Sequence, residues 1–167
     1  MIVRDTLVFR TLLAIARQRH GYDEVRSQAL LEMLAAADLI RRTVRRRLTE
    51  SSLSELQFGV LVVTLALDPE PVSLPTLVAH THSGRTALVG VIDQLEQRSL
   101  LTRDPRSSDR TEDLLTITET GREITETAQA NVLRAINQTG DLLEAPESTT
   151  LLGLFSRLLD RAQATEH

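Results

Sequence analysis

The chain contains no cysteine in its 167 residues. Disulfide bonds, thiolate metal ligands and cysteine redox switches are therefore excluded. Tryptophan and lysine are absent as well, so all 19 basic residues are arginine, and aromatic residues make up only 2%. A core must be built from leucine, valine, isoleucine and alanine, which favours packed helices. The arginines supply planar guanidinium groups that can hold a phosphate with two hydrogen bonds.

The sequence also lacks a long hydrophobic run. Its longest apolar stretch, residues 58–67, has about half of the roughly 20 residues that a membrane-spanning helix needs. Arginine and aspartate interrupt the apolar positions of residues 1–20, unlike the continuous apolar segment of a signal peptide. We therefore expect a soluble, cytoplasmic protein that does not enter a membrane.

Motifs of catalysis are missing from the sequence. It has no Gly-x-Ser-x-Gly elbow, no glycine-rich phosphate loop and no His-Glu-x-x-His motif, and it contains only seven glycines. His80 and His82 are two residues apart, whereas two histidines that bind a metal from one helix face are four apart. A turn could still bring them together, which leaves metal sensing as an alternative. We expect no enzyme activity, no cofactor and no metal site.

Negative charge is in slight excess. The formal net charge of −4 argues against a generally basic protein that coats nucleic acid. Any surface that binds DNA must therefore be local.

Apolar residues recur at helical spacing near both ends of the chain. They predict helices over residues 4–19 and about 30–48, broken near Gly21, and further helices over about 124–143 and 151–159, broken at Ala145-Pro146. These apolar stripes are too wide for one small domain to cover. A symmetric dimer is the economical way to bury them, and a compact monomer with folded-back helices is the alternative.

The middle of the chain predicts a helix-turn-helix. The Ser-x-x-Gln pattern at Ser54 and Gln57 is typical of a helix start, and that helix ends at residues 68–71. A helix from about Ser73, with proline in its first turn, leads to a turn at residues 81–84, where we expect Ser83 to be the N-cap of the next helix.

A short β-hairpin is predicted after the second of these helices. Residues 100–103 and 113–117 are compatible with strands, and the polar residues 104–112 lie between them. The predicted fold is therefore mainly α with a small β-wing, a winged helix-turn-helix flanked by N- and C-terminal helices. We divide it into residues 1–48, 49–118 and 119–167, as parts of one integrated domain.

The helix over residues 84–97 carries the candidate DNA-reading surface. A helical wheel places Leu88, Val91 and Leu95 inward, and it turns Thr86, Val89, Gly90, Asp93 and Gln97 outward with Arg85 on the flank. A recognition helix reads bases mainly with its N-terminal residues, where arginine can contact guanine and threonine or valine the thymine methyl. The candidates on this helix and its turn are Ser83, Arg85, Thr86, Val89 and Gly90.

The predicted wing carries three arginines. Arg103, Arg106 and Arg110 could bind phosphates or enter the minor groove beside the recognition helix. The alternative is a solvated helical hairpin followed by a turn whose arginines pair with Asp104 and Asp109.

Five arginines lie close together at positions 41, 42, 45, 46 and 47. We favour a solvated helix end, where positive charge complements the helix dipole. In the alternative, one or two of Arg41, Arg42 and Arg45 face a cleft, where they attract an anionic ligand or approach DNA phosphates.

Residues 53–121 resemble the core of the MarR family, the multiple antibiotic resistance regulators. Residues 95–103, LEQRSLLTR, are similar to the family pattern Leu-Glu-x-x-Gly-Leu-x-x-Arg, and residues 117–121, ITETG, to Leu-Thr-x-x-Gly. Residues 53–58, LSELQF, resemble the start of the family's second helix, and Asp109-Arg110 resembles the Asp-Arg-Arg tip of the wing. Ser99 stands where the family has glycine, and Thr111 where it has the second wing arginine.

The resemblance implies a function. It implies a homodimer, held by the terminal helices, that binds a pseudo-palindromic operator on double-stranded DNA with half-sites about 34–36 Å apart. It also implies repression of a nearby gene and a small anionic or aromatic effector that binds between the dimer helices and the DNA-binding lobe. The alternative is a helical protein-interaction module that keeps the winged-helix shape without binding DNA.

Overall fold

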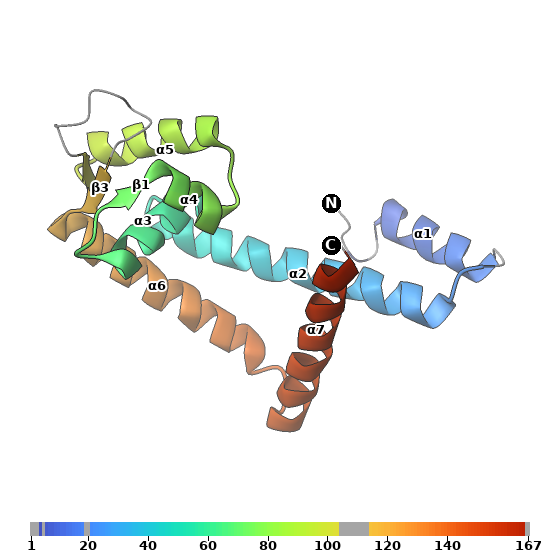
Figure 1. Cartoon of the computed structure of the whole chain (residues 1–167). Helices are drawn as coiled ribbons and strands as arrows, with labels where there is room; N and C mark the ends of the chain where they lie inside the picture. The colour runs from blue at the N-terminus through green and yellow to red at the C-terminus, as the bar shows by residue number, and fades with distance from the viewer. Residues whose placement is uncertain (1–3, 5, 19–20, 104–113, 166–167) are drawn as a thin grey trace.

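A computed structural model describes residues 4, 6–18, 21–103 and 114–165 of the chain. The described residues form seven helices and a three-stranded sheet, in which a compact lobe stands at one end of the long helices α2 and α6 (Figure 1). The elements are α1 (Leu7–Gln18), α2 (Glu24–Glu50), α3 (Glu55–Leu67), β1 (Val72–Ser73), α4 (Leu74–Thr81), α5 (Arg85–Gln97), β2 (Leu101–Arg103), β3 (Leu114–Ile117), α6 (Glu119–Gly140) and α7 (Ala145–Thr165). The predicted fold class, mainly α with a small β-wing, is confirmed.

Helices α1 and α2 are separated at Gly21, as predicted. Gly21 has a φ of +100°, a conformation that glycine adopts without steric cost. Asp23 then caps α2, because its carboxylate accepts a hydrogen bond from the backbone N–H of Arg26 at 2.9 Å. Helix α2 packs along α6, and both helices reach into the lobe.

Helix α3 begins with the predicted capping box. Ser54 Oγ accepts from the Gln57 N–H at 3.1 Å, and Gln57 Oε1 accepts from the Ser54 N–H at 2.9 Å. The helix ends at Asp68, whose carboxylate accepts a hydrogen bond of 2.6 Å from Arg122 of α6. That hydrogen bond is the main reason why the pKa of the Arg122 guanidinium is raised. The end of α3 is thereby fixed to the start of α6.

The sheet joins the helix-turn-helix to the wing. Its strand order is β1-β3-β2 and all pairs are antiparallel, with Val72 opposite Leu115 and Leu101 opposite Ile117. The predicted hairpin is therefore present, and β1 adds a third strand from the segment before α4.

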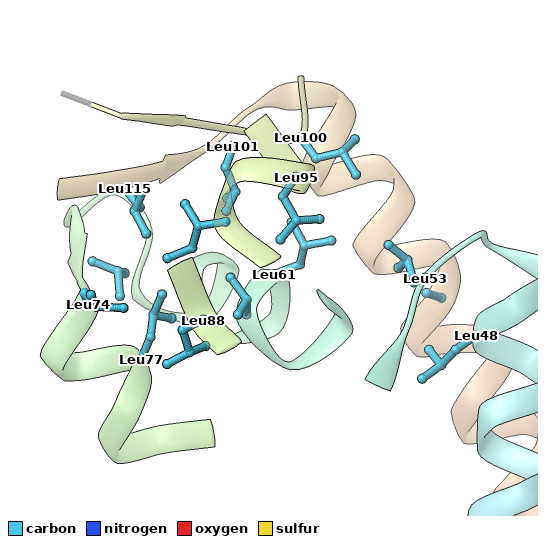
Figure 2. Packing of buried hydrophobic residues seen from close by; sticks show 14 of the residues in the cluster. Leu48, Leu53, Leu61, Leu74, Leu77, Leu88, Leu95, Leu100, Leu101 and Leu115 are labelled. Carbon is cyan, nitrogen blue, oxygen red and sulfur yellow. The ribbon is translucent and has the colours of Figure 1, made fainter. Parts of the chain in front are cut away.

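The core of the lobe is built mainly from leucine. Figure 2 shows Leu61 of α3, Leu77 of α4 and Leu88 of α5 close to one another, with Leu95, Leu101 and Leu115 near the sheet. All six are buried, and burial of each leucine side chain contributes about 1.5–3 kcal/mol. Ala128 and Val132 of α6 belong to the same cluster. Packing therefore holds the lobe and α6 in one relative orientation.

Helix α7 begins earlier than predicted. The break lies at residues 141–144, and Pro146 is inside the first turn of α7, where its missing N–H leaves no helical hydrogen bond unmade. Among the described residues, no single helix is long and apolar enough to cross a membrane. Helices α2 and α3 pass that test only as a pair bent by 75°, and core helices of globular domains pass it too.

Ser99, which stands where the MarR-family pattern has glycine, adopts the left-handed backbone conformation. Its φ is +56°, which costs about 1–2 kcal/mol for a residue with a Cβ. We expect Ser99→Gly to raise the free energy of unfolding by about 0.5–1 kcal/mol, since glycine's freedom in the unfolded chain offsets part of the relief. Urea unfolding at fixed protein concentration measures this change, and a destabilised variant would contradict the prediction.

Candidate nucleic-acid interface

The turn between α4 and α5 differs from its prediction in one detail. Gly84 is the N-cap of α5, whereas Ser83 is half-buried and its hydroxyl donates to the Thr81 carbonyl at 3.2 Å. The prediction of Ser83 as N-cap is therefore wrong. The physical reason is that His82 ends α4 in the left-handed conformation, with a φ of +51°, which moves the start of α5 one residue further on.

The inner face of α5 consists of Leu88, Ile92 and Leu95, which are all buried. Thr86 and Gly90 are exposed, as the helical wheel predicted, and Arg85, which the wheel placed on the flank, is exposed as well. Val89 was predicted to point outward, but it is half-buried and packs against the core. Each residue turns the helix by about 100°, so Val89 lies on the flank of the helix next to Leu88.

The wheel did not include every exposed residue of this face. Ala87 is exposed, and it lies three residues before Gly90, a spacing that places both on the same side of the helix. Its small side chain carries no polar group, and for that reason it did not stand out as a reader of bases. Gln97, predicted to point outward, is exposed as well, whereas Asp93 is half-buried.

Arg85 is the first residue of α5, and its positive charge is accessible to a binding partner. Among the described residues it forms no ion pair, and its side chain is exposed. The first turn of α5 also contains no acidic residue, so positive charge and free backbone N–H groups coincide there. This end of α5 is therefore suited to a negatively charged partner.

Gly90 has open space beside it. A Cβ built on this residue meets nothing within 4 Å, so packing inside the lobe does not require glycine at this position. A glycine in the middle of a helix costs about 0.5–1 kcal/mol relative to alanine. The close approach of another molecule's surface gives a reason for it.

We expect Gly90→Ala to separate stability from binding. The free energy of unfolding of the variant should be about 0.5–1 kcal/mol higher than that of the wild type. If α5 enters a DNA groove, as the sequence predicts, the variant should bind DNA about tenfold more weakly, because the methyl group holds the helix away from the groove. Gly140→Ala is the matched control, since its added Cβ also meets nothing within 4 Å but lies at the end of α6. Unchanged DNA affinity of Gly90→Ala would remove Gly90 from the interface.

The base of the wing holds the first of the three predicted arginines. Arg103 ends β2, and its guanidinium is hydrogen-bonded to Asp93 and lies 3.1 Å from Glu96, both on α5. Its side chain is only 14% exposed, so it does not project outward as expected of a wing cation. Arg106 and Arg110 lie outside the described residues.

The arginine cluster of α2 is largely paired. Arg42 bonds Asp38 one turn earlier, Arg47 bonds Glu50 at 3.0 Å, and Arg45 bonds Glu55 of α3 at 3.0 Å. Arg41 is exposed without an ion pair among the described residues. Most of the cluster therefore fits the favoured interpretation of a solvated helix end.

Arg45 also lines a groove at the junction of α2 and α3. The groove has a volume of about 570 Å³, and its lining is partly polar and partly apolar. The other lining residues are Thr49, Ser52, Leu53, Ser54, Glu55 and Leu56. The structure thus places one of the three candidate arginines, Arg45, at an open groove between the long helix α2 and the lobe.

His80 and His82 are both exposed at the end of α4. Within the part of the chain that the structure describes, no three His, Asp or Glu side chains are grouped as a metal site needs. The geometry therefore does not assign these two histidines a metal.

No family model matches the chain, and no curated protein sequence is significantly similar to it. Several solved structures, in contrast, are similar to the structure of this chain. A MarR-family transcriptional regulator from Rhodococcus sp. RHA1 has 23% identity and a TM-score of 0.66, with 82% of this chain and 95% of that chain covered. CouR from Rhodococcus jostii RHA1, bound to p-coumaroyl-CoA, has 24% identity and a TM-score of 0.63, with 79% and 90% covered.

Wild-type apo MarR from E. coli is similar to the same extent. It has 22% identity and a TM-score of 0.63, with 78% of this chain and 95% of that chain covered. At these identities the likeness shows the fold. The chain has the winged-helix fold of the MarR-family regulators, as the motifs within residues 53–121 predicted.

Proposed function

We propose that this chain is a transcriptional regulator that binds double-stranded DNA with α5 in the major groove. One observation carries the proposal: α5 presents Arg85, Thr86 and Gly90 to solvent at its N-terminal half, while its opposite face is buried in the lobe. A recognition helix reads base edges with these positions. Arg106 and Arg110 of the wing segment are proposed to bind phosphates beside it.

The proposed active form is a homodimer. Apolar side chains of the terminal helices are exposed in the single chain, among them Leu7 at 77% and Leu152 at 68%. A monomeric protein rarely exposes so large an apolar surface, and a twofold dimer buries the same face of both copies. The residues that we assign to this interface are Leu7, Val8, Leu12 and Ile15 of α1 and Leu152, Phe155 and Leu159 of α7.

Two lobes on one dimer would bind a pseudo-palindromic operator, with half-sites one helical turn apart. Binding of such a dimer over a promoter blocks transcription, so we propose repression as the mode of regulation. Operator binding and repression both require contact with the DNA, so we propose that the protein is cytoplasmic. No catalytic role is proposed.

A small anionic or aromatic effector is proposed at the groove that Arg45 lines. A ligand carboxylate there would replace Glu55 as the partner of Arg45, and the leucines of the groove would cover an apolar body. CouR, which shares the fold, binds p-coumaroyl-CoA, a molecule that is both anionic and aromatic. Arg41 and Arg42 lie on the same helix and are further candidates.

A salt-titrated binding assay tests the proposed function. Purified protein is mixed with fragments of its own upstream intergenic DNA, with unrelated DNA as competitor. We expect saturable binding to one fragment that survives competitor, with log affinity falling linearly with log salt by about 0.9 for each phosphate contacted. Light scattering in the same buffer reports whether the binding species is a dimer.

Two outcomes of this assay would contradict the proposal. Weak binding to every fragment alike, or none over the whole salt range, would reject a sequence-specific regulator. It would favour a protein-interaction module that uses the same exposed apolar helices.

A further inference from the structure

Arg103 lies between two carboxylates of α5. Its Nη2 is hydrogen-bonded to Asp93 Oδ1, and its Nε lies 3.1 Å from Glu96 Oε2. The Arg103 side chain is 14% exposed, whereas those of Asp93 and Glu96 are 37% and 43% exposed. The arginine is thus the most enclosed member of this cluster.

The cluster joins two elements that are both part of the proposed DNA-binding surface. Asp93 and Glu96 are three residues apart, so they lie on one side of α5. Arg103 is the last residue of β2 and is paired with Leu115 of β3 in the sheet register. The guanidinium makes a hydrogen bond with Asp93 and an ion pair with Glu96, and the Nε–Oε2 contact of that ion pair lacks hydrogen-bond geometry. Arg103 therefore connects the base of the wing to α5.

We propose that Arg103 is a positioning residue, which sets the place of the wing strands relative to α5 and does not itself bind a DNA phosphate. The inference rests on the proposed function. If Arg103 turned to a phosphate, Asp93 and Glu96 would be left unpaired on a helix that faces DNA, and both would repel the backbone. The ion pairs thus keep this arginine from the DNA and offset one of the two negative charges.

Removal of the charges of Asp93 and Glu96 tests the proposal, because a positioning role and a phosphate-binding role of Arg103 predict changes of operator affinity in opposite directions. The double variant Asp93→Asn, Glu96→Gln makes the protein more positive by two charges and releases Arg103. For a positioning residue we expect operator affinity to fall roughly tenfold despite the added positive charge. A phosphate-binding arginine that was held back would instead give tighter binding and a steeper salt dependence, and this result would overturn the proposal.

Single variants of Arg103 give a second comparison. Arg103→Ala should lower operator affinity roughly tenfold and leave the slope of log affinity against log salt unchanged, whereas loss of a phosphate contact lowers the slope by about one. Arg103→Lys keeps the charge but loses the two-pronged geometry, so it should resemble Arg103→Ala. Arg134→Ala on α6 removes one exposed arginine outside the lobe and is the charge control. A lower slope, or full rescue by lysine, would assign Arg103 to the phosphates.

A measurement without DNA separates this inference from the proposed function. Amide hydrogen exchange of residues 101–103 and 114–117 should be about tenfold faster in Arg103→Ala, while the amides of α3 keep the wild-type rate. Unchanged exchange in the strands would contradict the positioning role even if DNA binding were lost. Faster exchange in a chain whose wild type binds no operator would keep the positioning role and reject the regulator.

Discussion

Replacing Gly121 by alanine is expected to lower the free energy of unfolding by about 3 kcal/mol. Gly121 is the third residue of α6, and a Cβ built on it would lie 2.1 Å from the Leu100 carbonyl oxygen and 3.0 Å from Ile117 Cγ1. The closest obstacle is backbone, which cannot rotate away as a side chain can. The helix start or the strand must therefore shift.

The shift would disturb several contacts at once. The Leu100 carbonyl also accepts a hydrogen bond from the Thr118 N–H at 3.2 Å, and the Thr118 hydroxyl donates to the Ser99 carbonyl at 2.8 Å. Leu100 precedes β2, so the wing base should move with it, and operator binding should weaken too. Gly140→Ala is the matched control, because Gly140 is in the same helix and its added Cβ meets nothing within 4 Å.

Urea unfolding of both glycine variants at one protein concentration gives the comparison. The control should stay within about 0.5 kcal/mol of wild type, as is usual for surface positions. Equal stabilities of the two variants would show that the α6 start can move away from Leu100 without cost.

Arg85→Ala is expected to reduce affinity for the operator by roughly 10- to 100-fold, because a two-pronged arginine contact to guanine is worth about 1–3 kcal/mol. Affinity for unrelated DNA should fall much less, since that binding comes from phosphate contacts. The side chain is exposed and makes no ion pair among the described residues, so the fold should be unaffected. Competition binding against both DNAs measures the ratio.

Two further variants define the limits of this prediction. Arg134→Ala should leave the operator affinity unchanged, because Arg134 is exposed on α6. Arg110→Ala should weaken operator and unrelated DNA alike and reduce the salt slope by about one. If Arg85→Ala behaved in the same uniform way, Arg85 would be a phosphate-binding residue and α5 would need another reader of bases.

Several features around the candidate site follow from local patterns, although the N-cap of α5 was placed one residue too early. The capping box at Ser54 and Gln57 lies within four residues, and both of its hydrogen bonds are present. The exposed positions Arg85, Thr86 and Gly90 follow from the period of one helix. Val89 was misplaced because a wheel gives the direction of a side chain but not how far the neighbouring elements reach around the flank.

Other features of the site could not have been predicted, since their partners are far away in the sequence. Gln57 of the capping box bonds Gln94 of α5 at 2.9 Å, and Arg98 at the end of α5 bonds the Ser52 carbonyl at 2.8 Å. These contacts tie α5 to the start of α3 and to the turn before it. Periodicity and capping patterns carry no information on such pairs.

The sequence by itself determined the order of the helices, the β-hairpin, the capping box of α3 and the winged helix-turn-helix, because these depend on residues within a few positions of one another. Only the tertiary structure decided that Arg103 pairs with Asp93 and Glu96 and that Gly121 is in contact with Leu100. Each of those contacts joins separate elements of secondary structure. Whether a charge is free to bind DNA, or a glycine is indispensable, depends on the neighbour that packing brings to it.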